Sequence, residues 1–480
     1  MCQLFLGVFF ALIAILMYYV ILQYEDHKEV PHYHIIVGVM SARNHYKQRQ
    51  AIRDTWLAHS QTQANISNKV VVKFVLGKKA CHIPPEDRLD PYSCERWDVQ
   101  VSDWENDITV AKVDNTSPSI KQVTAIEQLT FKVHHPIVIT KIGLLAGDTM
   151  HLNYKVKLVD SLNGETIASA VFSDSQPGLP QEGFRYRAVE NYLLPKHFEG
   201  TIIGEILDSE ITNSTNTTTG FNIDNFNIKL YNGSGIISLY ASDIFQTNQT
   251  SPVVSFMFKV YEPGALKLHI AGKKLRAFEW GESMELENIK VTEEFIEKND
   301  MVLVNVIDTY RNLPLKLLKF YTWMTQRYMF NYTLKTDDDC YLNLENIVER
   351  SRLILDEGGS KQWWGQFRRN WYVERHGKWS ERLYTSSSYP TFGCGAGNVL
   401  SSDLVYWLAD NEENLQVYQG EDVSLGIWLA ALGPQFIADA HWQCDNRTCE
   451  PDMYNMPELS PQQLTNMWQN KMKCGNPCGC

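Results

Sequence analysis

The chain has 480 residues, of which 44% are hydrophobic and 21% are charged. This composition is typical of a globular protein of about two or three domains, and it argues against wholesale disorder and against a polytopic membrane protein. The formal net charge of -12 argues against broad binding to DNA or RNA, because phosphate backbones attract basic surfaces. We therefore expect no nucleic-acid partner.

The first residues indicate the cellular compartment. Residues 4–22 form an apolar run of about the length of one transmembrane helix. A cleaved signal peptide is the alternative, but the run is longer than a typical signal core and no small-residue cleavage site follows it. The sequence predicts a short cytoplasmic end and a signal-anchor helix over residues 1–22, followed by a stem over residues 23–32.

Asn-X-Ser/Thr sequons follow the apolar run, and the group around Asn213 is difficult to attribute to chance. Such sequons are glycosylated in the secretory lumen. They predict a single-pass type II protein of the Golgi or endoplasmic reticulum membrane, with a lumenal body and N-glycans on some of these sites. The sequons lie at Asn65, Asn115, Asn213, Asn216, Asn232, Asn248, Asn331 and Asn446.

The chain has 10 cysteines, of which Cys2 lies at the membrane end. In an oxidising lumen we expect most of the others to form disulfides. For the C-terminal group a zinc site is the alternative, although its spacings differ from the usual C-x2-C pattern. Beyond Cys2 the number is odd, so at least one thiol is free or paired between chains. The groups are Cys81 with Cys94, and Cys444, Cys449, Cys474, Cys478 and Cys480.

A strand, helix and strand begin the body. Residues 34–40 and 69–77 are short runs rich in β-branched residues, typical of buried parallel strands. Between them, residues 44–59 carry Arg49 and Arg53 four positions apart, on one helical face. This pattern predicts a βαβ unit and a parallel sheet.

Residues 98–299 have a different pattern, with short alternating stretches such as residues 253–260, turns between them and few helical signals. They predict a β-rich inserted domain, most simply a β-sandwich. The buried-strand pattern then returns. We expect one α/β domain made of residues 33–97 and residues 300–480, the second part having a cysteine-rich C-terminus.

Two acidic motifs carry the candidate chemistry. Asp337, Asp338 and Asp339 follow a short apolar strand, at the edge where open α/β sheets bind their ligands. A hard cation such as Mn²⁺ or Mg²⁺, shared with a nucleotide diphosphate, would neutralise them; a solvated acidic loop is the alternative. Glu421 and Asp422 form the second motif, for which a helix N-terminus is the alternative, because its dipole favours negative charge.

Together with their neighbours these motifs resemble, in order, the blocks of the β-1,3-glycosyltransferase family (family 31 type). The resemblance covers nearly the whole body from about residue 30, and Asn398 stands where the family commonly has an aromatic residue. The blocks are Arg43, Arg49-x-Ala-Ile-Arg53-Asp-Thr-Trp56, Ile307-Asp-Thr-Tyr-Arg-Asn-Leu313, Leu334-Lys-Thr-Asp-Asp-Asp-Cys-Tyr-Leu342, Gly393-Cys-Gly-Ala-Gly397 and Gln419-Gly-Glu-Asp-Val-Ser-Leu-Gly426.

The resemblance implies a GT-A type, Rossmann-like nucleotide-sugar-binding domain and an inverting transfer from a UDP-sugar that requires Mn²⁺ or Mg²⁺. It implies Asp339 as the principal metal ligand, with Asp337 and Asp338 near the ribose, the uracil or the metal. Asp422 is the expected general base, because the acceptor hydroxyl must lose a proton. The implied reaction moves GalNAc from UDP-GalNAc in β-1,3 linkage to the terminal GlcNAc of O-mannosyl glycans on glycoproteins. A UDP-galactose or UDP-GlcNAc donor, or an inactive lumenal glycan-binding protein, are the alternatives.

Basic and aromatic side chains complete the set of candidates. Arg43, Arg49, Arg53 and Lys335 are expected to contact the donor, since cationic side chains suit a diphosphate; pairing with carboxylates is the alternative. Four tryptophans either line the acceptor groove or pack in the core. They are Trp363, Trp364, Trp371 and Trp379.

Overall fold

The computed structural model describes residues 31–64, 66–100, 104–114, 125–126, 128–146, 153–207, 227–230, 235–241, 251–252, 254–356, 360–445 and 448–480. The predicted anchor, residues 4–22, lies outside these ranges, and so does every sequon except Asn331. Within the described ranges, none of the helices combines the length and the apolar character needed to span a bilayer.

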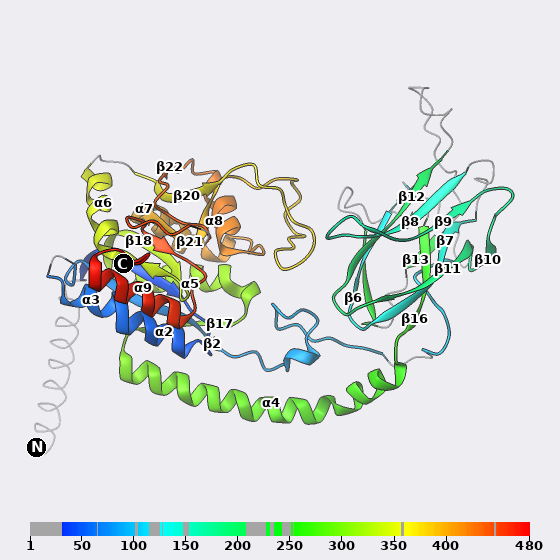
Figure 1. Ribbon diagram of the computed structural model, residues 1–480, viewed down its shortest axis with the longest axis horizontal. Helices are drawn as coiled ribbons and strands as arrows, with labels where there is room; N and C mark the ends of the chain where they lie inside the picture. The colour runs from blue at the N-terminus through cyan, green and yellow to red at the C-terminus, as the bar shows by residue number, and fades with distance from the viewer. Residues whose placement is uncertain are drawn as a thin grey trace, which may run out of the picture.

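A seven-stranded, mostly parallel sheet organises the part of the chain that carries the acidic motifs (Figure 1). The predicted βαβ unit is present, because β1 pairs in parallel with both β2 and β18. In spatial order the strands are β17 (Met301–Ile307), β2 (Val70–Lys79), β1 (His32–Met40), β18 (Met329–Asp337), β21 (Phe392–Ser401), β20 (Gln362–Arg368) and β22 (Gln435–Ala438).

Helices cover both faces of this sheet, which explains why its strands are apolar on both sides. Val37 of β1 belongs to the core on one face, and its neighbour Ile36 belongs to the core on the other. The α/β class expected from the sequence is therefore confirmed. The first face carries α2 (Tyr46–Ile52), a π-helical turn (Arg53–Leu57), α3 (Ala58–Thr62), α6 (Leu344–Asp356) and α9 (Pro461–Cys474); the second carries α5 (Leu313–Thr325), α7 (Ser402–Asp410) and α8 (Glu421–Ala430).

Two five-stranded sheets lie between β2 and β17 in the chain and share one apolar core. Phe131 and Phe256 meet across them, with ring centroids 4.6 Å apart. One sheet has the order β10 (Leu179–Gln181), β11 (Phe184–Leu194), β7 (Ile137–Leu145), β16 (Val254–Val260), β3 (Ile108–Thr109), and the other β14 (Ile237–Ala241), β6 (Gln128–Val133), β12 (Glu199–Ile206), β8 (Tyr154–Asp160), β9 (Thr166–Phe172). Short pairs are β13 (Asn227–Leu230) with β4 (Ala111–Asp114), β15 (Ser251–Pro252) with β5 (Ala125–Ile126), and β19 (Tyr341–Leu342) with β23 (Asn455–Met456).

A long helix, α4 (Pro263–Lys298), returns the chain from these sheets to the seven-stranded sheet (Figure 1). Sequence reasoning missed this helix, because it found few helical signals in residues 98–299. Pro263 suits the first turn, and Asn299 ends the helix in the left-handed conformation with φ 52°. Three internal glycines, which each cost a helix about 1 kcal/mol relative to alanine, hid the pattern; they are Gly264, Gly272 and Gly281.

Buried arginines connect α4 to residues 43–53, the turn and helix that follow β1. The Arg49 side chain is fully buried, and its Nη2 lies 2.6 Å from Glu294 Oε2. Arg53 bonds the same carboxylate at 2.7 Å and also pairs with Asp300. Arg43 pairs with Glu287 at 2.8 Å. Carboxylate pairing is therefore the role that the structure gives to all three arginines.

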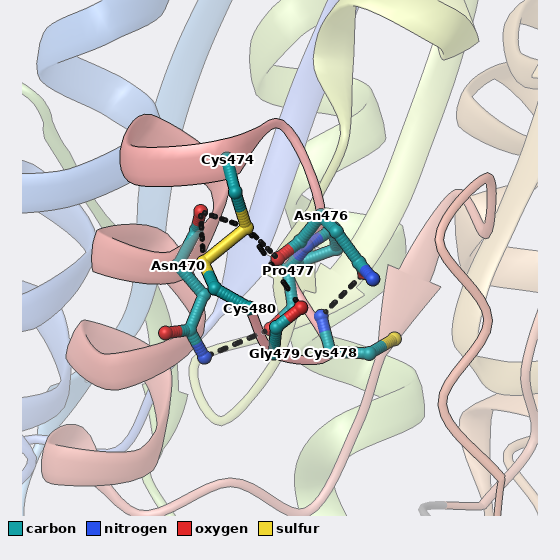
Figure 2. Close-up of a disulfide and its surroundings, with 7 residues drawn as sticks. All are labelled: Asn470, Cys474, Asn476, Pro477, Cys478, Gly479 and Cys480. Atoms are coloured by element: carbon teal, nitrogen blue, oxygen red, sulfur yellow. Dashed lines mark hydrogen bonds between the residues drawn. A yellow bond between two sulfur atoms is a disulfide. The ribbon is translucent and has the colours of Figure 1, made fainter.

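The cysteines form disulfides, and the zinc alternative for the C-terminal group is wrong. Figure 2 shows Cys474, the last residue of α9, joined to Cys480 beside Asn470. Among the described cysteines only Cys340, which is buried, has no disulfide partner. The other pairs are Cys81–Cys94, Cys394–Cys444 and Cys449–Cys478.

Replacing Glu294 by alanine is expected to destabilise the protein by about 3–5 kcal/mol, because Arg49 would become a buried charge without a counterion. Glu297→Ala is the control, since the Glu297 side chain is 70% exposed and its one ion pair among the described residues is with the adjacent Lys298. Urea unfolding followed by circular dichroism measures both. Equal midpoints for the two variants would contradict the structural role of the buried pair.

His134 predicts a pH-dependent part of the stability. It is buried and hydrogen-bonded to Ser238, and burial, with help from Lys132, lowers its pKa to about 4. The unfolded chain takes up the proton first, so this contribution is complete above pH about 6.5 and is lost as the pH falls towards 4, by roughly 3 kcal/mol. His134→Gln should flatten the unfolding free energy over that range, whereas His82→Gln, at an exposed histidine, should not.

Candidate active site

The acidic motifs meet in a cleft of about 1110 Å³, slightly larger than most small-molecule sites. Met40 and Asp337 end the paired strands β1 and β18 side by side, and Asp338 and Asp339 follow immediately. Asp422 reaches the same cleft from the first turn of α8. The structure thus brings together carboxylates that lie more than eighty residues apart in the sequence.

Lys335 holds the two acidic motifs together. Its Nζ lies 2.9 Å from Asp337 Oδ1 and 2.6 Å from Glu421 Oε1, and it also donates to the Gly395 carbonyl. The side chain is 1% exposed. A Cβ on Gly395 would lie 2.8 Å from Glu421 Oε1, so this block needs glycine to let the carboxylate approach.

The charges in the cleft shift one another's protonation. Burial alone would lower the pKa of Lys335, but Asp337 and Glu421 outweigh it and raise that pKa. Desolvation in the cleft raises the pKa of Asp337 to about 7, against the opposing charge of Lys335. Desolvation, with the charge of Glu421, also raises the pKa of Asp422 to about 7. A carboxylate with such a pKa is a stronger base than a solvated one.

Asp338 is held by neighbouring side chains. Ser41 donates to its Oδ2 at 2.6 Å, and His45 Nδ1 lies 2.9 Å from the same oxygen. Arg49 in turn donates to the Ser41 hydroxyl at 2.9 Å. The ion pair with Glu294 on α4 is therefore connected through two side chains to the second carboxylate of the acidic cluster.

Two carboxylates of the acidic motifs have no cationic partner among the described residues. Asp308, which also lines the cleft, pairs with Lys316 at 2.6 Å, and Asp337 and Asp338 are satisfied as above. Asp339 forms no ion pair within the described ranges, and burial together with the charge of Asp338 raises its pKa. Asp422 also forms no ion pair within the described ranges, and its Oδ1 accepts from the Val423 amide.

Three of the expected donor-binding side chains are already occupied. All five N–H groups of Arg49 bond to Glu294, Ser41 and backbone carbonyls. Arg43 lines the cleft but bonds to Glu287, Asn288 and two carbonyls. Lys335 is enclosed between Asp337 and Glu421. We therefore correct their role. Arg49 and Lys335 are buried and hold the acidic residues in position, and Arg43 connects the wall of the cleft to α4.

Other cationic and polar groups face the cleft, and sequence reasoning missed them. Arg88, Arg368 and Lys378 line it and, among the described residues, make no ion pair with a carboxylate. Three buried polar atoms in its wall also have no hydrogen-bond partner among the described residues, and the motif blocks quoted above could have pointed to two of them, those of Thr309 and Gln419. These atoms are Thr309 Oγ1, Tyr389 OH and Gln419 Oε1.

The tryptophans divide into two pairs. Trp363 and Trp364 are 0% and 2% exposed and pack in the cores of the seven-stranded sheet. Trp371 and Trp379 are 39% and 51% exposed and line the cleft from the segment that links β20 to β21. Asn398 fills a buried position, where its Oδ1 accepts from the Trp363 indole at 3.2 Å.

The β sheets contact this segment. Glu199 of β12 is buried and lies 2.9 Å from Lys132 Nζ and 3.1 Å from His376 Nδ1. It also accepts from the Gly377 amide at 3.3 Å, next to Trp379. The insert therefore supports the part of the cleft wall that carries the exposed aromatic side chains.

Comparison with known proteins agrees with this geometry. Residues 273–439 match the model of the family described as galactosyltransferase. The proteins named UDP-GalNAc:beta-1,3-N-acetylgalactosaminyltransferase 2 from Xenopus tropicalis and Homo sapiens are each 38% identical over 459 residues, covering 93% and 94% of this chain and 91% and 90% of their own lengths. Beta-1,3-galactosyltransferase 6 from Mus musculus is 31% identical over 186 residues, covering 38% of this chain and 57% of its own length.

Lys335→Met is expected to lower the free energy of unfolding by about 3–5 kcal/mol, because Asp337 and Glu421 would share a desolvated site without a counterion. The matched control is Lys47→Met at an exposed lysine of α2, which should change stability by less than about 0.5 kcal/mol. Thermal and urea unfolding test the difference, and similar losses in both variants would contradict the bridging role.

Proposed function

The chain belongs to the β-1,3-glycosyltransferase family and is a hexosyltransferase, and from that premise we propose that it transfers GalNAc from UDP-GalNAc in β-1,3 linkage to a terminal GlcNAc. The proposed acceptor is an O-mannosyl glycan of a glycoprotein. The N-acetylgalactosaminyltransferases that share 38% identity over most of their length support this donor. We assign nucleotide-sugar binding to the seven-stranded sheet, as a GT-A type domain.

One observation carries the proposal: of the five carboxylates in the two acidic motifs, Asp339 and Asp422 are the two without a cationic partner among the described residues. The transfer requires two different negative groups, one to hold a metal near the diphosphate and one to accept a proton. Each remaining carboxylate of these motifs is held by a cation or a hydrogen-bond donor of the chain itself. Charge and contacts thus support the same two residues as the family resemblance.

Asp339 is the proposed ligand of Mn²⁺ or Mg²⁺. Among the described residues no group of three or more His, Cys, Asp or Glu side chains is arranged to hold a metal alone. This fits an ion that is bound by one or two carboxylates and completed by phosphate oxygens and water. When bound, such an ion supplies positive charge to the diphosphate leaving group.

Asp422 is the proposed general base. Its raised pKa suits removal of a proton from the 3-hydroxyl of the acceptor sugar. As that oxygen bonds to the anomeric carbon of GalNAc, the bond to UDP breaks and the configuration inverts. Glu421 is engaged by Lys335 and is therefore the weaker candidate.

The groups that line the cleft suggest how the two substrates bind. Arg88, Arg368 and Lys378 are the cations available for the diphosphate. Trp371 and Trp379 offer exposed ring faces of the kind on which sugars stack. We propose the donor against the ends of β1 and β18, and the acceptor against the aromatic segment.

The proposed location is the Golgi or endoplasmic reticulum membrane, with residues 1–22 as a type II anchor and the body in the lumen. Four disulfides support an oxidising compartment. N-glycans on some of the predicted sequons would follow from the same location.

The test incubates the full chain, purified in detergent, with Mn²⁺, a GlcNAc-terminated acceptor and UDP-GalNAc, UDP-galactose or UDP-GlcNAc. We expect β-1,3 transfer from UDP-GalNAc, with the linkage read by NMR. Preference for UDP-galactose or UDP-GlcNAc would change the proposed donor but keep the proposed type of reaction. Absence of transfer from every donor would overturn the function.

Two variants distinguish the proposed role of Asp339 from that of Asp422. Asp339→Asn should remove the Mn²⁺-dependent part of UDP binding, measured by calorimetry, together with transfer. Asp422→Asn should keep UDP binding but reduce kcat by about 10²–10⁴-fold. Asp54→Asn, at an exposed aspartate, is the control and should change neither. A normal kcat for Asp422→Asn would place the base elsewhere.

A further inference from the structure

Helix α4 exposes a long apolar stripe. Six large apolar side chains on one side of the helix are 47–75% exposed, whereas Phe295, at 40%, lies away from them, and the stripe extends over about 42 Å at 1.5 Å per residue. Contiguous exposed apolar surface of this kind marks interaction sites in soluble proteins. The side chains are Leu268, Leu275, Phe278, Leu286, Ile289 and Ile296.

The opposite face of α4 accounts for its contacts within the chain. Glu287 pairs with Arg43 and Glu294 with Arg49, both shortly after β1, and Trp280 donates from its indole to the Cys81 carbonyl at 2.8 Å. Figure 1 shows α4 along one edge of the molecule, between the seven-stranded sheet and the two β sheets. The apolar stripe is therefore not needed for the docking of α4 within its own chain.

The stripe is symmetric about Glu282. Leu268 and Ile296 lie fourteen residues to either side of it, and Leu275 and Ile289 lie seven. Phe278 and Leu286 lie four residues to either side. We propose that a second copy of this chain binds here, with the two α4 helices antiparallel about a two-fold axis at Glu282. Each apolar side chain then lies opposite its counterpart of similar size on the other copy.

The local sequence suits such a contact. Steps of seven residues keep side chains on one side of paired helices, and a closed two-fold contact is the commonest way in which a protein assembles with itself. Gly281 and Ser283 flank the axis and are exposed, and a Cβ on Gly281 would meet no atom within 4 Å. The helices can therefore approach closely at the centre.

Charge favours a second copy over a lipid surface. Glu279, Glu282 and Glu293 lie within or beside the stripe, and the chain carries a net charge of -12, whereas helices that bind anionic membranes have basic polar faces. On the axis the two copies of Glu282 meet and repel. Replacing this residue with an apolar one should therefore strengthen the pairing.

The test uses the full chain in detergent and measures its mass and dissociation constant by analytical ultracentrifugation. We expect a dimer that Leu275→Glu weakens at least tenfold and that Glu282→Leu strengthens at least tenfold. The control is Leu179→Glu, at a leucine of β10 that is 75% exposed, which should have no effect. Circular dichroism checks that each variant is folded.

Cross-linking tests the register. Chains with Leu275→Cys should form a disulfide with chains carrying Ile289→Cys, whereas Leu275→Cys chains alone should not cross-link. A monomer at all concentrations, or a dimer indifferent to Leu275→Glu and Glu282→Leu, would overturn the proposal. So would a monomer whose binding to phosphatidylserine vesicles is lost in Leu275→Glu, because a membrane would then be the occupant.

Discussion

The buried ammonium of Lys335 is the contact on which the site depends. The end of β18 and the start of α8 both carry carboxylates, and like charges brought into a desolvated cleft repel one another. Lys335 neutralises one carboxylate from each element, Asp337 and Glu421. With those two groups engaged, Asp339 and Asp422 can face the same cleft and remain available for ligand chemistry.

A second buried charge connects the site to the rest of the chain. Arg49 bonds to Glu294 on α4 and to the Ser41 hydroxyl, which donates to Asp338. Because α4 also carries the chain back from the insert, one ion pair supports both the return helix and the acidic cluster. Breaking a buried pair leaves an uncompensated charge. We therefore expect substitutions on α4 that break this pair to alter the acidic cluster in the cleft.

The insert contributes to the cleft from the other side. Glu199 fixes the segment that holds Trp379 through His376 and the Gly377 amide, and the exposed face of α4 offers a surface for a second copy. The insert therefore supports the cleft wall to which we assign the acceptor, and α4 carries the surface that we assign to the second copy.

The sequence by itself determined the α/β class, the first βαβ unit and the two acidic motifs, because strand periodicity and runs of charge are local properties of the chain. It also indicated disulfides without their pairing, which depends on which loops meet. The partner of Arg49 lies 245 positions away, so no local pattern could distinguish diphosphate binding from an ion pair. The glycines of α4 hid a helix that tertiary contacts stabilise. Only the fold decided which carboxylates were left without a counterion, because that depends on where Lys335 and Arg49 lie in three dimensions.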